Sequence, residues 1–479
     1  MTASRTAILF LALSIAAPAA AQDTLQSRVE AKLGEAGPGV RYGLVVAGED
    51  GKEIVAVNPD GRFIPASNTK MFTTAAAFAT LPALDQPDTI GGASVRLEGR
   101  DVVLKGNGDA RLSSAADCVA DCLATLADAV AAKTRTVRDV IGDDSLFPDQ
   151  RWGPGMSWNN IPSPSGTAAS ALTLDDNELE LSVTPGMADM PPALAGRFYY
   201  NVVNEARTVA GEADNLGYAR EPNERVLRIT GTIGAAAKPR VMRFGIDDPA
   251  DYAATRFAEM LRDRGVKVTG RVRAVHRPLS PADDPEVRKG TPAARPPMPE
   301  PLARLTPAPL IEDLTHTNKV SQNLHAELFL RRVAAQQGSG SIADGVAVVE
   351  AMLKGAGVPR RAYDFSDGSG MSSYNRVAPR GVVVFLRWIA AQPWGAAWRS
   401  TLPIAGTDGT LARRFKGTLL EGKLFAKTGT LNATNGLSGY MVAKSGKTLT
   451  FSAYANDVPE GVSATGAMDA ALALIAAEN

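Results

Sequence analysis

The hydrophobic residues near the N-terminus alternate between helical and strand-like spacing. Residues 24–35 follow the spacing of an amphipathic helix, and residues 40–57 predict two strands joined by a turn at residues 48–52. An alanine-rich run then extends from Ser67 to Leu81 without an internal Gly or Pro. This run predicts a buried helix that begins close to Ser67.

The C-terminal part shows helical spacing first and strand-like spacing later. Helices are expected near residues 310–337, 345–356 and 380–391. The pattern then predicts a meander of three strands at residues 424–430, 436–443 and 448–456. A final helix, ending at Ala477, closes the chain.

The middle of the chain has a different pattern. From about Ala93, short strands and turns alternate, and a helix is expected at residues 114–132. Further strands are predicted at residues 178–183, 197–203 and 225–232, which makes this region α+β. It ends in residues 278–309, which contain ten of the 31 prolines and predict an exposed linker or long loop.

The first residues have the pattern of a cleaved secretory signal. Arg5 precedes an apolar run from Ala7 to Ala17, and Ala19 and Ala21 form an A-x-A cleavage site. We predict a signal peptide at residues 1–21, no other membrane-spanning segment, and a periplasmic location. A retained N-terminal anchor is the alternative, but a spanning helix needs roughly 20 apolar residues.

Composition excludes several classes of protein. The 479 residues are 45% hydrophobic and 21% charged, as in a globular protein of several domains. Basic and acidic residues number 51 each, so no excess of positive charge favours nucleic acid as a partner. Cys118 and Cys122 are the only cysteines and, without a nearby His, favour a local disulfide over a metal site or two free thiols.

Only three histidines are present, namely His276, His316 and His325. None lies near a G-x-S-x-G motif, and the chain has no H-E-x-x-H zinc motif. The sequence therefore argues against a His-dependent serine hydrolase and against a zinc enzyme of that type. If a serine is the nucleophile, its base must be another residue.

Ser67 and Lys70 form an S-x-x-K motif at the start of the predicted buried helix. Residues three apart share one face of a helix, so the Lys70 amine can reach the Ser67 hydroxyl. Lysine can act as a base where its surroundings lower its pKa. The motif alone is weak, because a helix-capping Ser followed by a solvated Lys has the same pattern.

Two further motifs favour a catalytic site. Residues 427–430 (K-T-G-T) lie on a strand expected inside the sheet, where Lys is unusual, and the Lys427 charge is expected to lower the Lys70 pKa. S-x-N occurs at residues 157–159, 321–323 and 373–375. Ser321 and Asn323 fall between two predicted helices, and such a break is needed for residues two apart to face one site.

The order of these motifs resembles that of the penicillin-recognising serine enzymes. The long segment between Ser67 and Ser321 resembles the class C low-molecular-mass penicillin-binding proteins, the D-alanyl-D-alanine carboxypeptidase/endopeptidase family. Further runs match that family at residues 106–109 (G-N-G-D), 318–324 (N-K-V-S-Q-N-L), 326–327 (A-E), 367–372 (D-G-S-G-M-S) and 405–411 (A-G-T-D-G-T-L). The match covers nearly the whole mature chain and assigns S-x-N to Ser321.

The resemblance implies an α/β (α+β) fold of the serine transpeptidase and β-lactamase type, with an antiparallel sheet flanked by helices. Residues 22–85 and 303–479 are expected to form a discontinuous penicillin-binding catalytic domain. Residues 86–302 are expected to form one or two inserted α+β domains, ending in the proline-rich linker at 278–309.

The resemblance also implies a role for each motif residue. Ser67 would attack the carbonyl of a D-Ala-D-Ala peptide while Lys70 takes its proton, and the backbone N–H groups of Ser67 and Thr430 would form the oxyanion hole. Ser321 would pass a proton to the leaving amine, and Asn323 would hold Lys70 and the substrate amide. Water would then release the acyl-enzyme without a metal or cofactor.

On the K-T-G strand, Lys427 and Thr428 would bind the terminal carboxylate of the substrate, and Gly429 would let the substrate lie along the strand. The implied partners are peptidoglycan stem peptides ending in D-Ala-D-Ala, and the β-lactams that mimic them. Gln322 replaces the common Asp of S-D-N. Some members carry an acidic residue beside an aromatic in the insert for the free amine of the stem peptide, whereas residues 158–160 (W-N-N) have none.

Two alternatives differ from this interpretation. A β-lactamase or esterase of the same superfamily would keep S-x-x-K and K-T-G, although the class A E-x-x-L-N motif is absent between Asn323 and Lys427. A non-catalytic protein that binds the cell wall is the other alternative. The presence of every expected catalytic side chain argues against it.

Overall fold

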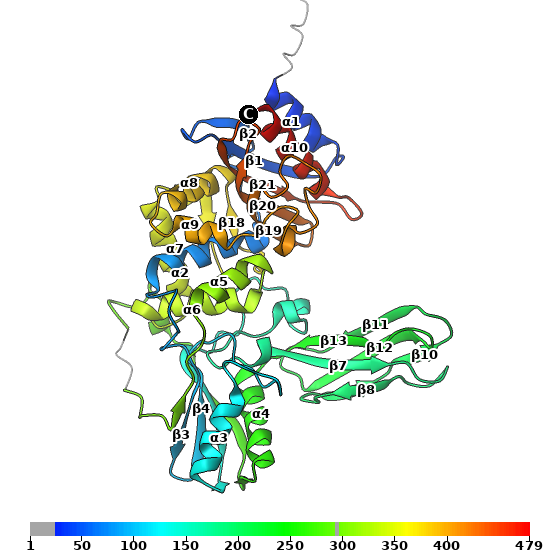
Figure 1. The fold of residues 1–479 in the computed structure, drawn as a ribbon, viewed down its shortest axis with the longest axis vertical. Coiled ribbons are helices and arrows are strands. Elements are labelled where there is room, and N and C mark those ends of the chain that lie inside the picture. Colours follow the sequence, from blue (N-terminus) through cyan, green and yellow to red (C-terminus); the bar gives the residue numbers. More distant parts are fainter. Residues whose placement is uncertain (1–23, 293–296) are drawn as a thin grey trace, which may run out of the picture.

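The computed structural model describes residues 24–292 and 297–479, so the predicted signal peptide lies outside the described residues. Its upper lobe contains an antiparallel sheet with the strand order β19-β20-β21-β1-β2 (Figure 1). The strands are β1 (Arg41–Ala47), β2 (Glu53–Val57), β19 (Leu424–Leu431), β20 (Thr434–Val442) and β21 (Thr448–Asn456). Because β1 pairs with β21, the N-terminal hairpin extends the C-terminal meander into one sheet.

Helices cover both faces of this sheet, which explains the continuous apolar run of β1. Leu44 and Val46 belong to the core shared with α1 (Leu25–Gly34) and α10 (Ala464–Glu478). Val45 and Ala47 pack instead on Val383 of α8 (Pro379–Ala390). Successive strand side chains point to opposite faces, so covering both faces requires an apolar residue at every position.

A layer of helices on the second face surrounds α2 (Lys70–Thr80), which is buried along most of its length. The other helices of this layer are α5 (Leu310–Lys319), α6 (Asn323–Gln337), α7 (Ile342–Gly355), α8 and α9 (Gly395–Ser400). Phe72 of α2 stacks on Phe385 of α8 with ring centroids 4.9 Å apart. The predicted helices and strands of both terminal parts are therefore confirmed, with bounds that differ by a few residues.

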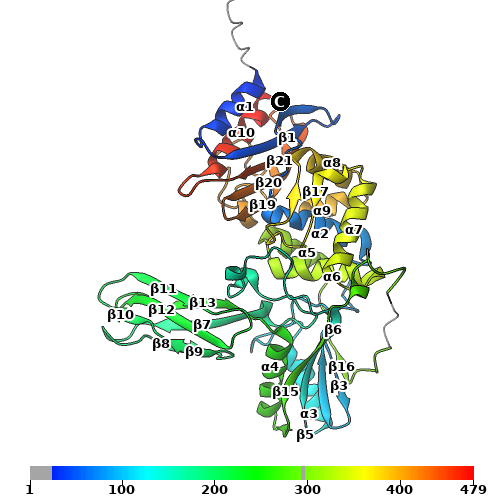
Figure 2. The ribbon, with the colours of Figure 1, turned by 180° about the vertical axis from the view of Figure 1, so that it is seen from behind.

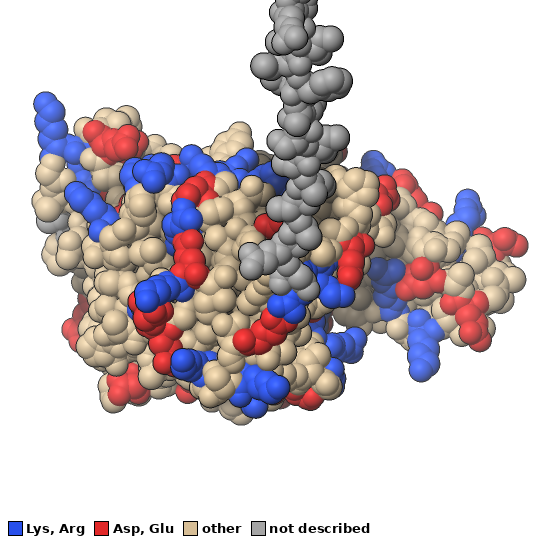
Figure 3. Space-filling view, turned by 90° about the horizontal axis from the view of Figure 1, so that it is seen from above, with Lys and Arg blue, Asp and Glu red and all other residues tan. Residues whose placement is uncertain are grey.

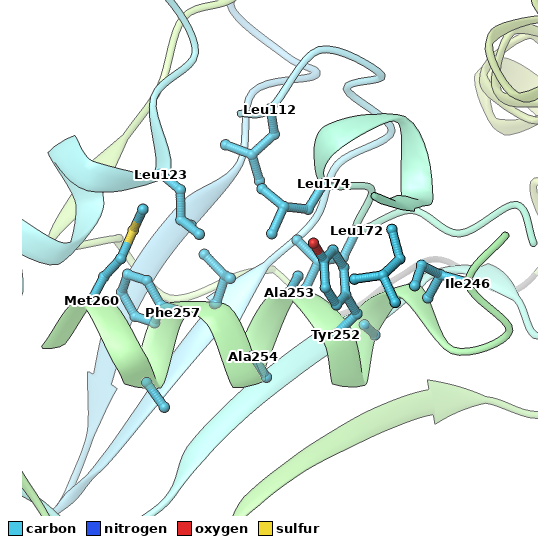
Figure 4. Close-up of a cluster of buried hydrophobic side chains, with 14 of the residues drawn as sticks. Leu112, Leu123, Leu172, Leu174, Ile246, Tyr252, Ala253, Ala254, Phe257 and Met260 are labelled. Carbon is cyan, nitrogen blue, oxygen red and sulfur yellow. The ribbon is translucent and has the colours of Figure 1, made fainter. Parts of the chain in front are cut away.

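The lower lobe is built around a second five-stranded sheet, in the order β15-β6-β4-β3-β16. Its strands are β3 (Ser94–Glu98), β4 (Asp101–Lys105), β6 (Val140–Pro148), β15 (Val272–Arg277) and β16 (Ala303–Arg304). The short strands β5 (Thr136–Val137) and β14 (Lys267–Val268) pair beside it. Figure 4 shows α4 (Pro249–Asp263) presenting Tyr252, Ala253 and Phe257 to Leu172 and neighbouring apolar side chains. This cluster is the core of the lower lobe.

The predicted helix at residues 114–132 is wrong in its first half. The helix, α3 (Leu123–Lys133), begins only after the Cys118–Cys122 disulfide, which closes the preceding turn. The bridge and the backbone hydrogen bond from Ser113 N to Asp121 O hold this segment out of a helical path.

A narrow arm of strands projects sideways from the lower lobe (Figures 1 and 2). Its strands are β7 (Glu178–Thr184), β8 (Ala193–Gly196), β9 (Asn201–Asn204), β10 (Arg207–Val209), β11 (Asp214–Ala219), β12 (Val226–Gly234) and β13 (Arg240–Gly245). The single strand predicted at residues 197–203 is wrong, because the chain changes sheets there. β8 pairs with β7, whereas β9 pairs with β12 in the other sheet of the arm.

The hydrophobic clusters support the predicted division of the chain, which we keep as a proposal. One cluster draws its buried residues from positions 93–305, and the two main clusters of the upper lobe draw theirs from positions 29–81 and 310–476. Since β16 pairs with β3, the proposed insert extends to about Leu305, slightly beyond the predicted end at residue 302.

The first half of the proline-rich segment is attached to the rest of the protein, unlike a flexible linker. Asp283 is buried and accepts a hydrogen bond from Arg277 at 2.7 Å, and Arg288 pairs with Asp344 of α7 at 2.6 Å. Charged groups, rather than apolar burial, therefore attach the first half of this segment to both lobes.

The upper surface carries basic and acidic side chains in an interspersed pattern, with no extended region of one sign on the face seen in Figure 3. This pattern agrees with the equal numbers of basic and acidic residues. Among the helices of the described residues, none has the length and apolar character needed to cross a bilayer.

We predict that limited trypsin digestion of the folded protein cuts first after Lys289. Lys289 and Gly290 are exposed, whereas the neighbouring Arg288 is held by Asp344. The two fragments should stay together in size-exclusion chromatography, because β16 remains paired with β3. A first cut within residues 424–456 would contradict the proposed architecture.

Candidate active site

Ser67 and Lys70 meet at the junction of a tight turn and a helix. Residues Ala66–Thr69 form a short 3₁₀ helix, η1, which passes directly into α2 at Lys70. In a 3₁₀ turn, side chains three residues apart are nearly eclipsed. The Lys70 Nζ atom accordingly lies 2.8 Å from the Ser67 Oγ atom. The predicted neighbourhood of these two side chains is therefore present in the structure.

The Lys70 amine is completely buried and donates to three oxygen atoms. They are Ser67 Oγ at 2.8 Å, Asn323 Oδ1 at 2.6 Å and the Ser369 carbonyl at 2.7 Å. These partners come from η1, from α6 and from the D-G-S-G segment, which are far apart in the sequence. One amine thus joins three segments that meet only in the folded chain.

Burial lowers the pKa of Lys70 to about 7, although the carboxylates of Asp367 and Glu327 act in the opposite direction. The sequence led us to expect that the Lys427 charge lowers this pKa, but the cause in the structure is the desolvation of the amine. At neutral pH a substantial fraction of Lys70 is uncharged and able to accept a proton.

Ser321 and Asn323 occupy the break between α5 and α6, as the S-x-N motif predicted. Ser321 has a φ of 67°, a left-handed conformation that turns the chain sharply between the helices. Asn323 is the first residue of α6, and both the oxygen and the nitrogen of its side-chain amide form hydrogen bonds. Its Oδ1 atom accepts from Lys70 at 2.6 Å, and its Nδ2 atom donates to the Ser165 carbonyl at 2.8 Å.

Lys427 of β19 is also completely buried. Its Nζ atom donates to Ser321 Oγ at 2.9 Å and to the Thr428 carbonyl at 3.1 Å. Burial, followed by the charge of Lys70, lowers the pKa of Lys427 well below its usual value. The hydroxyl of Thr428 lies 2.8 Å from that of Thr410, which belongs to the A-G-T-D-G-T-L run.

The K-T-G strand lies at the edge of the sheet, so the expectation that it would lie inside is wrong. In the strand order β19-β20-β21-β1-β2, β19 is the first strand and pairs only with β20. The N-terminal strands β1 and β2 extend the sheet at its other end. Residues 424–426 of its outer edge are covered by the 403–405 segment. An edge strand can accept an extended peptide as an additional strand.

Gly429 allows η1 to pack directly against β19. A Cβ atom at Gly429 would lie 2.4 Å from the Pro65 carbonyl oxygen, which is too close for any side chain. The Asn68 side chain donates to the Lys427 carbonyl at 2.9 Å across the same contact. This close approach brings the backbone of Ser67 beside the strand that carries Thr430.

The D-G-S-G segment contributes a backbone carbonyl that sequence reasoning missed. Asp367 is buried and accepts hydrogen bonds from Gly370 N at 2.9 Å and Ser372 N at 2.6 Å. Glu327 accepts from the N–H groups of Gly368 and Ser369, both at 2.9 Å. These contacts fold the segment so that the Ser369 carbonyl faces Lys70. Because every residue has a backbone carbonyl, the sequence could not show that this one would accept from Lys70.

Residues 154–165, which belong to the proposed insert, contact the segments that carry the candidate site. Besides the Ser165 carbonyl on Asn323, the Ser372 hydroxyl donates to the Pro154 carbonyl and Ser373 N donates to the Gly155 carbonyl at 3.0 Å. Trp158, which the resemblance associates with the stem peptide, is 62% exposed in this loop.

The remaining candidates lie elsewhere. The other two S-x-N runs do not supply a hydroxyl to Lys70 within the part of the chain that the structure describes, and each of the three histidines contacts groups other than Ser67. Residues 24–292 and 297–479 contain no cluster of His, Cys, Asp or Glu arranged to hold a metal ion.

Comparison with known proteins identifies the family. The sequence profile of the D-Ala-D-Ala carboxypeptidase 3 (S13) family matches residues 25–478. A D-alanyl-D-alanine carboxypeptidase of Actinomadura sp. (strain R39) is 34% identical over 431 residues, covering 84% of this chain and 75% of the relative. The D-alanyl-D-alanine carboxypeptidase DacB of Haemophilus influenzae is 26% identical over 443 residues, covering 88% of this chain and 87% of the relative.

The fold agrees with this comparison. The crystal structure of penicillin binding protein 4 (dacB) from Haemophilus influenzae superposes with a TM-score of 0.77 at 21% identity, covering 92% of this chain and 98% of that chain. The same protein complexed with a novel β-lactam superposes with a TM-score of 0.72 at 20% identity, covering 93% of this chain and 97% of that chain. The predicted family and fold are confirmed. This chain belongs to the D-Ala-D-Ala carboxypeptidase 3 (S13) family and is a serine-type D-alanyl-D-alanine carboxypeptidase.

Proposed function

We propose that the protein hydrolyses peptidoglycan stem peptides ending in D-Ala-D-Ala, with additional endopeptidase activity on cross-links, through an acyl-enzyme on Ser67. The observation that carries this proposal is the 2.8 Å contact between Ser67 Oγ and the buried Lys70 amine. A pKa near 7 makes Lys70 a suitable base at neutral pH.

In the acylation step, Ser67 attacks the carbonyl of the penultimate D-Ala and its proton passes to Lys70. Asn323 Oδ1 and the Ser369 carbonyl, at 2.6 and 2.7 Å, then stabilise the ammonium group that forms. The N–H groups of Ser67 and Thr430 bind the oxyanion of the tetrahedral intermediate. The tight packing of η1 on Gly429 supports this pairing, because it keeps the two backbone segments adjacent.

The second pair of groups serves the leaving amine and the substrate carboxylate. Ser321 passes its hydroxyl proton to the leaving D-Ala and regains a proton from the Lys70 ammonium, which returns Lys70 to its neutral form. The 2.9 Å contact from Lys427 holds the Ser321 hydroxyl in place. Lys427 and Thr428 bind the terminal carboxylate. Because burial lowers the pKa of Lys427, a bound carboxylate favours its protonated form, and the site selects peptides with a free C-terminus.

Water then hydrolyses the acyl-enzyme, and β-lactams are proposed to inhibit by forming a longer-lived ester on the same serine. The complex of the Haemophilus influenzae protein with a β-lactam supports this part of the proposal. A periplasmic location is supported by the signal-like residues 1–21 and by the Cys118–Cys122 bridge, since disulfides persist in oxidising compartments.

The proposed function is tested with purified muropeptides and mass spectrometry. Pentapeptides should lose one D-Ala, and cross-linked dimers should be cleaved to monomers, as separate products. A Ser67→Ala variant is the control and should yield neither product. Rapid turnover of β-lactams together with intact muropeptides would instead establish the β-lactamase alternative, and inactivity on both would favour the wall-binding alternative.

We predict covalent labelling of Ser67 by a fluorescent penicillin, because the strained cyclic amide occupies the place of the D-Ala-D-Ala bond. Peptide mapping should find the adduct on Ser67. Ser67→Ala should abolish labelling and leave the melting temperature close to that of the wild type, since the half-buried hydroxyl is a small loss. An adduct on Ser157, Ser321 or Ser373 would overturn the assignment.

We predict that the acylation rate rises with pH through a midpoint near 7. Below the Lys70 pKa of about 7 the amine is charged and accepts no proton, and above it the neutral base accumulates. Lys70→Arg should slow acylation by about 100- to 10,000-fold, because guanidinium stays protonated. Stopped-flow measurements with a chromogenic β-lactam give the midpoint of the pH profile and the acylation rate of the Lys70→Arg variant.

Lys319→Arg is the matched control for this substitution. Lys319 pairs with Asp408 at 2.6 Å and lies two residues before Ser321, so it is the alternative base of the same region. This control should acylate at nearly the wild-type rate. Fast acylation by Lys70→Arg with slow acylation by Lys319→Arg would transfer the role of base to Lys319.

A further inference from the structure

A buried histidine joins the insert to the turn that carries Ser321 and Asn323. His325 lies two residues after Asn323 in α6 and is 3% exposed. Its Nδ1 atom pairs with Asp313 of α5, and its Nε2 atom lies 2.8 Å from Asp176 Oδ1 of the insert. The ring thus connects α5, α6 and the inserted region.

The ring is a cation in this setting. Burial lowers the pKa of His325, but the charges and hydrogen bonds of Asp313 and Asp176 outweigh that effect and raise it to about 10. In the same way, His325 holds the pKa of Asp313 below its usual value in spite of burial. At neutral pH the three side chains therefore form a carboxylate–imidazolium–carboxylate triad.

The backbone around Asp176 is strained. Asp175, Asp176 and Asn177 have φ values of 50°, 53° and 51°, three consecutive residues in the left-handed region. L-residues adopt this conformation singly and at an energetic cost, so a run of three needs strong external support. Strain of this kind is typical of a residue that must be held in one place for function.

That support comes from inside the insert. Asp175 accepts a hydrogen bond from Ser114 N at 2.7 Å. Asn177 is completely buried, and its Nδ2 atom donates to the Ala168 carbonyl at 2.8 Å. Both ends of the strained turn are therefore anchored, and the residue between them presents its carboxylate to His325.

The triad contacts the first turn of α6, which also carries Asn323. His325 ties α5 to α6 through Asp313, across the turn at Ser321. The insert makes a second contact nearby, from the Ser165 carbonyl to Asn323 Nδ2 at 2.8 Å. Asn323 in turn holds the Lys70 amine at 2.6 Å. A shift of the first turn of α6 would move Asn323, and with it the proposed base.

We propose that His325, held between Asp176 and Asp313, is a positioning residue for acyl transfer, through which the insert fixes the α5–α6 turn and the Asn323–Lys70 contact. This inference rests on the proposed roles of Lys70 and Asn323. It makes the insert part of the catalytic apparatus, in addition to any role in substrate binding.

The test is Asp176→Asn. Asparagine tolerates the left-handed region as aspartate does, so the strained turn is kept and only the charge is lost. The Asp176 side chain is 42% exposed, so the variant should fold. We expect the acylation rate constant of Ser67 to fall about tenfold, with the dissociation constant of the initial β-lactam complex unchanged. Stopped-flow acylation resolves the two constants.

Glu312→Gln is the matched control. Glu312 precedes Asp313 on α5 and pairs with Arg111 of the insert at 3.2 Å, so the substitution removes a carboxylate from the same interface without touching His325. It should acylate at the wild-type rate. The Asp176→Asn/His325→Gln double variant should be no slower than His325→Gln alone, because the Asp176 charge is proposed to act only through the His325 ring.

Wild-type acylation by Asp176→Asn would overturn the inference, as would an equal loss in Glu312→Gln. A weaker initial complex with an unchanged rate constant would also overturn it, because the triad would then act on binding. Failure of the wild-type protein to acylate Ser67 would be a different result, since it would contradict the proposed function itself.

Discussion

The burial of the Lys70 amine is the constraint on which the rest of the structure depends. An amine removed from water is costly unless its protons meet acceptors, and here Ser67, Asn323 and Ser369 supply them at 2.6 to 2.8 Å. These acceptors belong to three segments that meet only in the folded chain. Any packing error that opens one contact leaves a buried donor unsatisfied and also moves a group of the proposed reaction.

Lys427 joins β19 to two other segments, one through its buried side-chain amine and the other through its backbone carbonyl. Lys427 donates to Ser321 at 2.9 Å, and its own carbonyl accepts from Asn68 at 2.9 Å. The contact with Asn68 brings the backbones of η1 and β19 close together, which Gly429 permits. Burial and the nearby charge of Lys70 disfavour the charged form of Lys427, and under the proposed function a bound carboxylate would restore it.

The proposed insert has its own main hydrophobic cluster and also contacts the candidate active site. Its main hydrophobic cluster is separate from those of the upper lobe, and a smaller cluster joins apolar residues of the insert, among them Phe147, to Leu324 and Leu328 of α6. Its polar contacts, however, reach Asn323 through Ser165 and His325 through Asp176. Hydrogen bonds and ion pairs have strict geometry, so they fix the position of the insert more closely than apolar contact would.

The sequence by itself determined the elements of the two terminal parts and the identity of the motif residues. Apolar spacing is a local property, and Ser67, Lys70, Ser321, Asn323 and residues 427–430 carry unusual side chains at recognisable intervals. The tertiary structure alone decided that β19 lies at the sheet edge, that burial rather than Lys427 lowers the Lys70 pKa, and that Ser369 and Ser165 contribute carbonyls. Strand order and desolvation arise from contacts between distant segments, and a backbone carbonyl is common to every residue, so no local pattern reports them.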